Sequence, residues 1–179
     1  MELTVSSFRV RRAIAADAAR LADVGAKLFA QTFAARNTVD DMADYLAHAF
    51  GEEQQRRELS EARNLVWLAE DENATPIGYA HVKLDSATAG LRSDKPAELA
   101  RIYADERWHG RGVGAELLRA CVDGASHAGA SALWLGVWKE NPRGIAFYRK
   151  SGFRVIGEQT FLLGSDPQHD WVMVRDLTP

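Results

Sequence analysis

Residues 107–120 read RWHGRGVGAELLRA, and three glycines stand at alternate positions just before a helical pattern. They are Gly110, Gly112 and Gly114. The first turn of a helix carries unpaired N–H groups and a partial positive charge, so a phosphate is stabilised there. A glycine lets such a ligand approach the backbone because it has no side chain. The stretch is therefore either a cradle for a pyrophosphate or an ordinary turn with tight helix packing.

Two better-known phosphate-binding loops fit this stretch poorly. A P-loop needs Gly-Lys followed by Ser or Thr at the helix start, whereas Ala115 and Glu116 follow Gly114 here. A dinucleotide fingerprint has the spacing Gly-x-Gly-x-x-Gly directly after a strand. Here the spacing is Gly-x-Gly-x-Gly. Neither of the two loops accounts for the glycines.

The chain of 179 residues has the composition of a soluble globular protein, and we expect a single domain over 1–179 with a core from about 8 to 177. Its net charge of −3 gives no basic footprint for nucleic acid. The single cysteine, Cys121, cannot form an internal disulfide, which fits a reducing compartment. We see no secretion signal and no apolar run near the roughly 20 residues of a membrane helix. These features predict a cytoplasmic protein that binds neither nucleic acid nor a membrane.

Hydrophobic periodicity predicts the order strand, helices, three strands, helix, strand, helix, two strands. Asp17 is expected to cap the first helix through its side chain. The segments 64–70 and 76–84 are expected to form an antiparallel hairpin, and the polar residues 85–96 a loop. The other predicted segments are strands at 8–12, 98–103, 132–138, 153–163 and 168–177, a turn at 164–167, and helices at 18–33, 38–50, 52–63, 113–128 and 142–151.

Two motifs resemble the signatures of the GNAT (Gcn5-related N-acetyltransferase) superfamily. The first is [QR]-x-x-G-x-[GA] after a strand, which residues 109–114 match except that His109 replaces Gln or Arg. The second is NPRGIAFYRKSGF at 141–153, with Asn141, Phe147-Tyr148 and Ser151-Gly152-Phe153. The resemblance extends from about Phe8 to Leu177. Four further segments resemble the bacterial PaiA-type branch, which acetylates the polyamines spermidine and spermine: AQTFAARN (30–37), DDMADYLAHAF (40–50), WLGVWKENPRGIAFYRKSGF (134–153) and TFLLGSDPQHDWVM (160–173).

The resemblance implies an α/β (α+β) fold with a mixed central sheet of about six to seven strands, flanked by helices and splayed at the acetyl-CoA site. It also implies acetyl-CoA as co-substrate, no metal and a possible homodimer. The pantetheine arm is expected to pair with the strand backbone as an added strand. Cofactor contacts implied are Ile102, Tyr103 and Ala104 for that arm, Gly110, Arg111, Gly112, Val113, Gly114 and Ala115 for the pyrophosphate, His109 supporting the loop, Asn141 and Tyr148 near the pantetheine, and Lys150 or Arg149 at the 3′-phosphate.

The family transfers the acetyl group by direct attack of a primary amine within a ternary complex. Because an alkylammonium has a pKa of about 10.4, a base must first take its proton. By resemblance Tyr148 is the general acid that protonates the leaving thiolate, and Glu98 is the general base. His81, or a water chain, is the reserve base. The alternatives are a core tyrosine, a solvated glutamate at a strand end, and a histidine satisfied by its neighbours.

The acceptor is expected to be a small amine, and a polyamine needs carboxylates along its length and aromatic faces for its cations. Candidates are Asp40, Asp44, Tyr45, Tyr79, His81 and Trp138, although a solvated helix face would also explain the acids. Two other functions stay open. One is acetylation of a protein N-terminus or lysine, and the other is a coenzyme A-binding regulator without activity.

Overall fold

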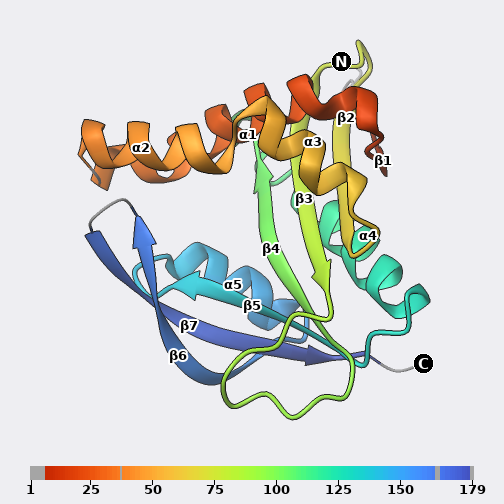
Figure 1. Cartoon of the computed structure of the whole chain (residues 1–179), viewed down its shortest axis with the longest axis vertical. Coiled ribbons are helices and arrows are strands. Elements are labelled where there is room, and N and C mark those ends of the chain that lie inside the picture. The colour runs from red at the N-terminus through yellow and green to blue at the C-terminus, as the bar shows by residue number, and fades with distance from the viewer. Residues whose placement is uncertain (1–6, 37, 164–165, 178–179) are drawn as a thin grey trace, which may run out of the picture.

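The computed structural model describes residues 7–36, 38–163 and 166–177. Their core is a seven-stranded sheet in the order β1-β2-β3-β4-β5-β7-β6 (Figure 1). Only β4 and β5 pair in parallel, so the sheet is mixed, as predicted. The strands are β1 (Phe8–Arg12), β2 (Asn64–Asp71), β3 (Pro76–Leu84), β4 (Pro96–Ala104), β5 (Ala132–Trp138), β6 (Arg154–Leu163) and β7 (Asp166–Asp176).

Helices cover both faces of the sheet because successive side chains of a strand point to opposite faces. On β2, Val66 and Leu68 pack with the first helices, whereas Trp67 and Ala69 pack in the cluster that holds α4. The helices are α1 (Ala18–Phe33), α2 (Val39–Ala49), α3 (Glu52–Ser60), α4 (Val113–His127) and α5 (Pro142–Lys150), with the short 3-10 helices η1 (Ala15–Asp17), η2 (Ala34–Arg36) and η3 (Glu106–Trp108).

The predicted cap of α1 is wrong, although the predicted span of the helix agrees with the structure. The Asp17 side chain makes no capping bond to α1. Instead it is buried and accepts hydrogen bonds from the Arg11 guanidinium, at 2.8 and 2.9 Å. The charged partner lies on β1, and the stronger charge-assisted bond replaces the cap. By contrast, Thr38 caps α2 by accepting from the Asp41 N–H.

The hairpin and the loop that precede β4 agree with the sequence. Strands β2 and β3 pair antiparallel, and residues 85–95 contain no helix or strand. Strand β4 begins at Pro96, two positions before the predicted start, because Pro96 and Ala97 already pair with β5. At the other hairpin, β6 begins one position after its predicted start, whereas β7 begins at Asp166, two positions before its predicted start, and residues 164–165 of the predicted turn lie outside the described residues.

The two parallel strands separate soon after they meet. Their pairing runs only from Pro96↔Ala132 to Glu98↔Trp134, although both strands continue. Strand β4 also contains an extra residue, Ala100, because Leu99 and Arg101 oppose the consecutive β3 residues Val82 and His81. Such a bulge bends a strand and increases its twist. The prediction of splayed strands is therefore confirmed, and the resulting opening positions the site.

Candidate active site

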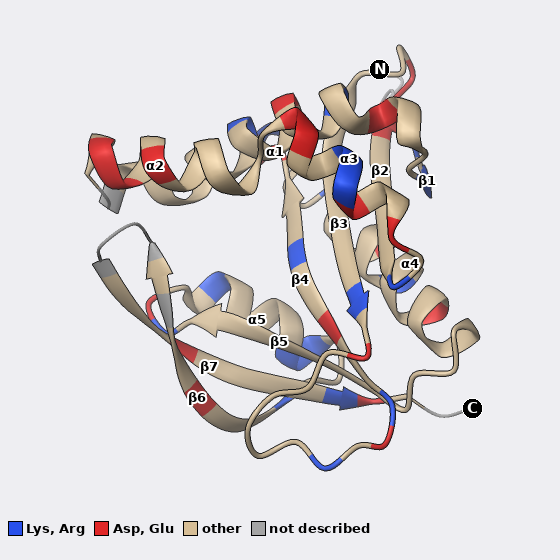
Figure 2. Cartoon of the chain, viewed as in Figure 1, with Lys and Arg blue, Asp and Glu red and all other residues tan. Residues whose placement is uncertain are grey.

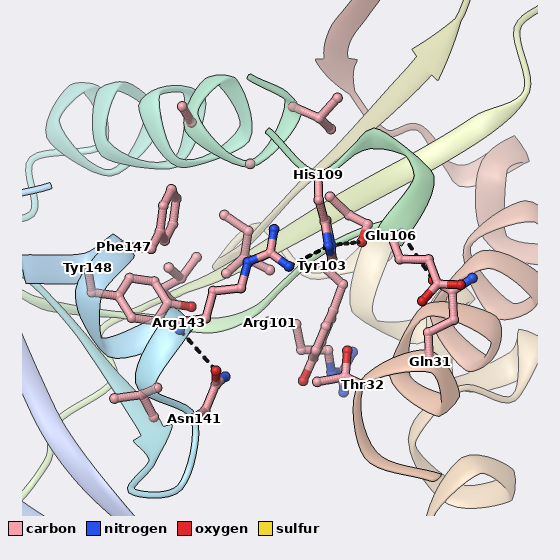
Figure 3. Close-up of a pocket in the computed structure, with 18 of the residues that line it drawn as sticks. Gln31, Thr32, Arg101, Tyr103, Glu106, His109, Asn141, Arg143, Phe147 and Tyr148 are labelled. Atoms are coloured by element: carbon pink, nitrogen blue, oxygen red, sulfur yellow. Dashed lines mark hydrogen bonds between the residues drawn. The ribbon is translucent and has the colours of Figure 1, made fainter. Parts of the chain in front are cut away.

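A cleft of about 550 Å³ occupies the opening between β4 and β5. Residues from both faces of the sheet line this splay cleft. The start of α4, the beginning of α5 and the end of α1 contribute side chains (Figure 3). The cleft reaches the glycine stretch at Gly110, Gly112 and Gly114, so the glycine loop before α4 forms one of its walls.

The glycine loop has the geometry of an exposed helix start. Gly110 and Gly112 have φ values of 78° and 89°, in the left-handed region that favours glycine. Gly112 is the N-cap of α4, and intrahelical bonding starts with the Glu116 N–H donating to the Gly112 carbonyl at 3.0 Å. The preceding N–H groups of the first turn therefore have no intrahelical acceptor. They lie at the splay cleft and suit an anion.

His109 ties this loop to two neighbouring elements. Its Nδ1 accepts from the Arg143 guanidinium of α5 at 2.8 Å, and its Nε2–H donates to the Ala104 carbonyl at 2.9 Å (Figure 3). Arginine has only donors, so this arrangement fixes which ring nitrogen carries the proton. The histidine at the altered signature position thus fastens the loop to the end of β4, and it leaves Arg143 at the cleft wall.

Helix α5 places two further predicted residues at the splay cleft. Asn141 caps the helix by accepting from the Gly144 N–H at 2.9 Å, while Pro142 lies in the first turn, as expected. Tyr148 packs edge-on against Phe147 and Phe153, with ring centroids 5.3 and 5.8 Å away. Burial raises the pKa of Tyr148, so its hydroxyl keeps its proton at neutral pH.

A second, smaller hollow of about 150 Å³ lies on the side of the sheet that α1 and α2 cover. We call it the aromatic pocket because six aromatic rings line it. Its polar members include Glu98, Arg101 and Asp170. Burial raises the pKa of Asp170 to about 6, against the opposing effects of Gln159 and His169. The rings belong to Phe29, Phe33, Tyr45, Phe50, Tyr103 and Trp138.

The splay cleft and the aromatic pocket meet at a shared wall. Gly136 of β5 and Ala100, Arg101 and Tyr103 of β4 line both of them. Gly136 is exposed although its neighbours Leu135 and Val137 are buried. A molecule in the cleft and a molecule in the pocket can therefore come into contact beside Gly136.

A largely buried ion pair reaches the aromatic pocket through Arg101. Arg101 donates to the Glu58 carboxylate at 2.8 and 3.1 Å. Next to this pair, His81 is fully buried and its Nε2 lies 3.0 Å from the Asn64 amide oxygen. Burial lowers the pKa of His81 to about 3, so the ring is neutral at physiological pH. Because Arg101 is paired, its charge at the pocket is largely compensated.

The structure brings most predicted cofactor residues together and separates some of the predicted acceptor residues. Residues 102–104 and 109–115 (except Arg111), Asn141 and Tyr148 line the splay cleft, whereas Lys150 and Arg149 are exposed on α5 away from its lining. Glu98, Tyr45 and Trp138 line the aromatic pocket. His81 and Tyr79 line neither cavity and are buried, and Asp40 and Asp44 are exposed on α2 (Figure 2).

Several lining residues were not predicted. Gln31, Thr32 and Arg143 lie at the splay cleft, and Arg101 and Asp170 at the aromatic pocket. A signal existed for Asp170, which is a carboxylate directly before the apolar run Trp171-Val172-Met173-Val174. Gln31 and Thr32 belong to the segment AQTFAARN quoted for its resemblance, and they reach the site because α1 ends beside β4.

Two further observations concern only the described part of the chain. It contains no group of three or more His, Cys, Asp or Glu side chains placed to hold a metal ion. None of its helices combines the length and the apolar character needed to cross a bilayer.

Comparison with known proteins shows which family this chain resembles. The model of the acetyltransferase (GNAT) family matches residues 28–153. An uncharacterized N-acetyltransferase of Mycobacterium tuberculosis is 30% identical over 162 residues, which cover 90% of this chain and 98% of that protein. An uncharacterized N-acetyltransferase of Lactobacillus delbrueckii subsp. lactis is 27% identical over 154 residues, which cover 86% and 88%.

A solved structure has the same fold. The PaiA N-acetyltransferase of Thermoplasma acidophilum, determined in complex with coenzyme A, superposes with a TM-score of 0.75 at 22% identity and covers 95% of this chain and 99% of that one. The chain therefore belongs to the acetyltransferase (GNAT) family, and the prediction of an acetyltransferase is confirmed.

Proposed function

We propose that this protein transfers the acetyl group of acetyl-CoA to a primary amine of a small molecule, with both substrates bound at once. The observation that carries this proposal is the junction at Gly136, where a long cleft ending at exposed helix amides meets a small aromatic pocket. A direct transfer needs the donor and the acceptor in contact, and holding them so supplies a large part of the rate enhancement.

The splay cleft suits the coenzyme in three respects. Residues 102–104 of β4 have lost their β5 neighbours, so their backbone can pair with an extended pantetheine arm. Asn141 uses its Oδ1 as a helix cap, and its Nδ2 can donate to the same arm. The amides at the start of α4 suit the pyrophosphate, and the Arg143 guanidinium, bonded to His109 beside them, adds positive charge. Coenzyme A is also bound in the PaiA structure that shares the fold.

The aromatic pocket suits a primary ammonium carried on an apolar stem. Aromatic faces attract cations, and the carboxylates Glu98 and Asp170 supply negative charge. Arg101 does not oppose this because Glu58 pairs with it. We propose a polyamine such as spermidine or spermine as the acceptor. Its remaining cations would extend toward Asp40 and Asp44, which are exposed on α2, a helix that contacts β6.

Tyr148 is our candidate for the general acid. Its ring lies at the splay cleft, and its raised pKa keeps the phenol protonated until a thiolate forms beside it. For the base, Glu98 is the candidate from the sequence, and it lines the aromatic pocket. His81 lines neither cavity and its Nε2–H donates to the Asn64 amide oxygen, so it does not fit the role of reserve base.

The test is release of coenzyme A thiol from acetyl-CoA in the presence of separate amines, peptides and aminoglycosides. We expect release with spermidine or spermine and little with peptides, because the aromatic pocket holds only about 150 Å³. Release with a peptide alone would favour the protein-acetylating alternative. Binding of coenzyme A without release by any acceptor would favour the regulator and contradict the proposal.

A further inference from the structure

We propose that Asp170 of β7 is the catalytic base that takes the proton from the acceptor ammonium. The inference rests on the proposed function and gives a role to a residue that was not among the candidate site residues of the sequence analysis. Asp170 is 8% exposed and lines the aromatic pocket. Four features of its position carry the assignment.

The first feature is its approach to the junction of the two cavities. A β-carbon on residue 136 would lie 3.0 Å from the Asp170 Oδ2 and 2.5 Å from the Gln159 Nε2. Only a glycine allows the carboxylate and the amide to lie this close to the β5 backbone. Because Gly136 lines both cavities, the carboxylate stands beside the place where an amine must meet a thioester.

The second feature is a row of three side chains across three strands. Trp138 of β5 is directly opposite Asp170 of β7, which is directly opposite Gln159 of β6. Residues opposite one another in a ladder share a face of the sheet. The indole therefore flanks the carboxylate on one side and the amide holds it on the other. An ammonium beside Asp170 can contact an aromatic face at the same time.

The third feature is the electrostatic surroundings. The charged and titratable groups around the carboxylate are His169 of β7, Glu98, Arg101 and Tyr103 of β4, and Tyr45 of α2. Arg101 is engaged by Glu58, so no free cation of the described lining neutralises Asp170. Burial dominates and raises its pKa to about 6, while the Gln159 hydrogen bond opposes the rise. A base works best when its pKa lies near the operating pH.

The fourth feature is the contrast with Glu98. Glu98 Oε2 accepts a hydrogen bond from the Ser86 hydroxyl at 2.7 Å. Glu98 is opposite Trp134, at the last position where β4 and β5 still pair, so it lies at the closed end of the opening. Asp170 is opposite Trp138, the last residue of β5, on the open side. The geometry favours Asp170 over Glu98 as the base.

The proposed step is balanced in atoms and charge. The Asp170 carboxylate takes one proton from the ammonium, and the neutral amine then attacks the thioester carbonyl carbon. The C–N bond forms and the C–S bond breaks, while the nitrogen loses a second proton. The departing thiolate gains one proton, from Tyr148, whose phenolate regains it from the nitrogen through solvent. Asp170 then releases its proton to water, so the products are the acetamide, coenzyme A thiol and one proton.

The experiment measures kcat/KM for spermidine, by thiol release, in the full chain and in Asp170→Asn across pH values on both sides of 6. Asparagine has the same shape and can keep a hydrogen bond with Gln159. Glu98→Gln is the comparison variant, because it removes the other carboxylate of the aromatic pocket, and we expect it to raise the KM for spermidine while the acidic limb of the profile persists. Coenzyme A affinity is measured for each variant to verify that the splay cleft is intact. We expect Asp170→Asn to lose at least about 100-fold in kcat/KM and to lose the acidic limb of the profile.

Two outcomes would overturn the inference in different ways. If the native chain acetylates spermidine and Asp170→Asn keeps its rate within about threefold, or Glu98→Gln causes the large loss instead, Asp170 is not the base and the proposed function stands. If the native chain binds coenzyme A and acetylates no amine at all, the inference and the proposed function fall together.

A second variant, Gln159→Leu, tests the assignment without removing the carboxylate. The Gln159 hydrogen bond lowers the pKa of Asp170, so its loss should raise that pKa further. We expect the acidic limb of the kcat/KM profile to move to higher pH while the plateau at high pH persists. A limb that stays in place would show that another group controls the profile, against the inference.

Discussion

The splay cleft and the aromatic pocket are built in different ways. The cleft depends mainly on backbone, with left-handed glycines, unpaired helix amides and a strand edge exposed by the divergence of β4 and β5. The pocket depends on side chains from α1, α2, β4, β5, β6 and β7. A backbone site can be read from a short contiguous motif. A side-chain site assembled from six elements, such as the proposed acceptor pocket, leaves little trace in any short stretch of sequence.

The largest effect is expected from removing the acid on the donor side. Tyr148→Phe should reduce kcat by a factor of about 10² to 10⁴, because the thiolate would leave without its proton. The affinity for acetyl-CoA should change little, since the ring and its packing against Phe147 and Phe153 remain. The check combines thiol release with calorimetric binding of coenzyme A. An unchanged kcat would remove Tyr148 from the mechanism.

The next largest effect is on stability, and it comes from the buried carboxylate of Asp170 in the aromatic pocket. The pKa of Asp170 is raised from 3.8 to about 6 in the folded protein, so the folded state binds more protons than the unfolded state between these values. The free energy of unfolding therefore falls as pH rises through this range, and the loss is complete above about pH 6. Above about pH 6, the Asp170→Asn variant should therefore have a free energy of unfolding up to about 3 kcal/mol higher than that of the native chain.

This difference is measured by urea unfolding of both chains at a pH near 4 and a pH near 8. The two chains should have similar stability at the lower pH and diverge at the higher one. Other titrating groups cancel in the difference because both chains contain them. A constant difference at both values would mean that burial does not penalise the carboxylate.

The sequence could reveal the features that depend on local backbone, and it could not reveal those that depend on side chains from distant elements. The α1 boundaries, the β2–β3 hairpin and the start of α4 were predictable because periodicity and glycine placement are local signals. The Asp17 cap was mispredicted because its partner Arg11 comes from β1, which the local sequence does not place. Asp170 was missed because its role depends on the β5-β7-β6 strand order, in which β7 inserts between β5 and β6.

A glycine substitution should affect the splay cleft alone. Gly112→Ala forces a β-carbon onto a backbone with φ of 89°, which costs roughly 1–2 kcal/mol at the cap of α4. We expect coenzyme A to bind about tenfold more weakly. The free energy of unfolding should fall by the same roughly 1–2 kcal/mol. Gly157→Ala is the control, because its β-carbon would meet nothing within 4 Å and its φ is not left-handed. Equal behaviour of the two variants would refute the requirement for a left-handed glycine.

The smallest effect tests the aromatic pocket without touching its carboxylates. Tyr45 stacks on Phe29 with a centroid distance of 4.6 Å and lines the pocket. Tyr45→Leu should raise the KM for spermidine by roughly 2- to 6-fold through the loss of a cation–π face, with little change in the KM for acetyl-CoA. Tyr45→Phe keeps the ring and should behave like the native chain. A rise in the KM for acetyl-CoA instead would place the ring on the donor side.

The most direct test is a crystal structure of the chain with coenzyme A and spermidine bound together. We expect the pyrophosphate on the amides of residues 110–115 and the pantetheine along β4. We also expect a terminal nitrogen of spermidine in the aromatic pocket, within hydrogen-bonding distance of the Asp170 carboxylate and beside Gly136. Density for the polyamine elsewhere, or a coenzyme that does not enter the opening between β4 and β5, would contradict this expectation.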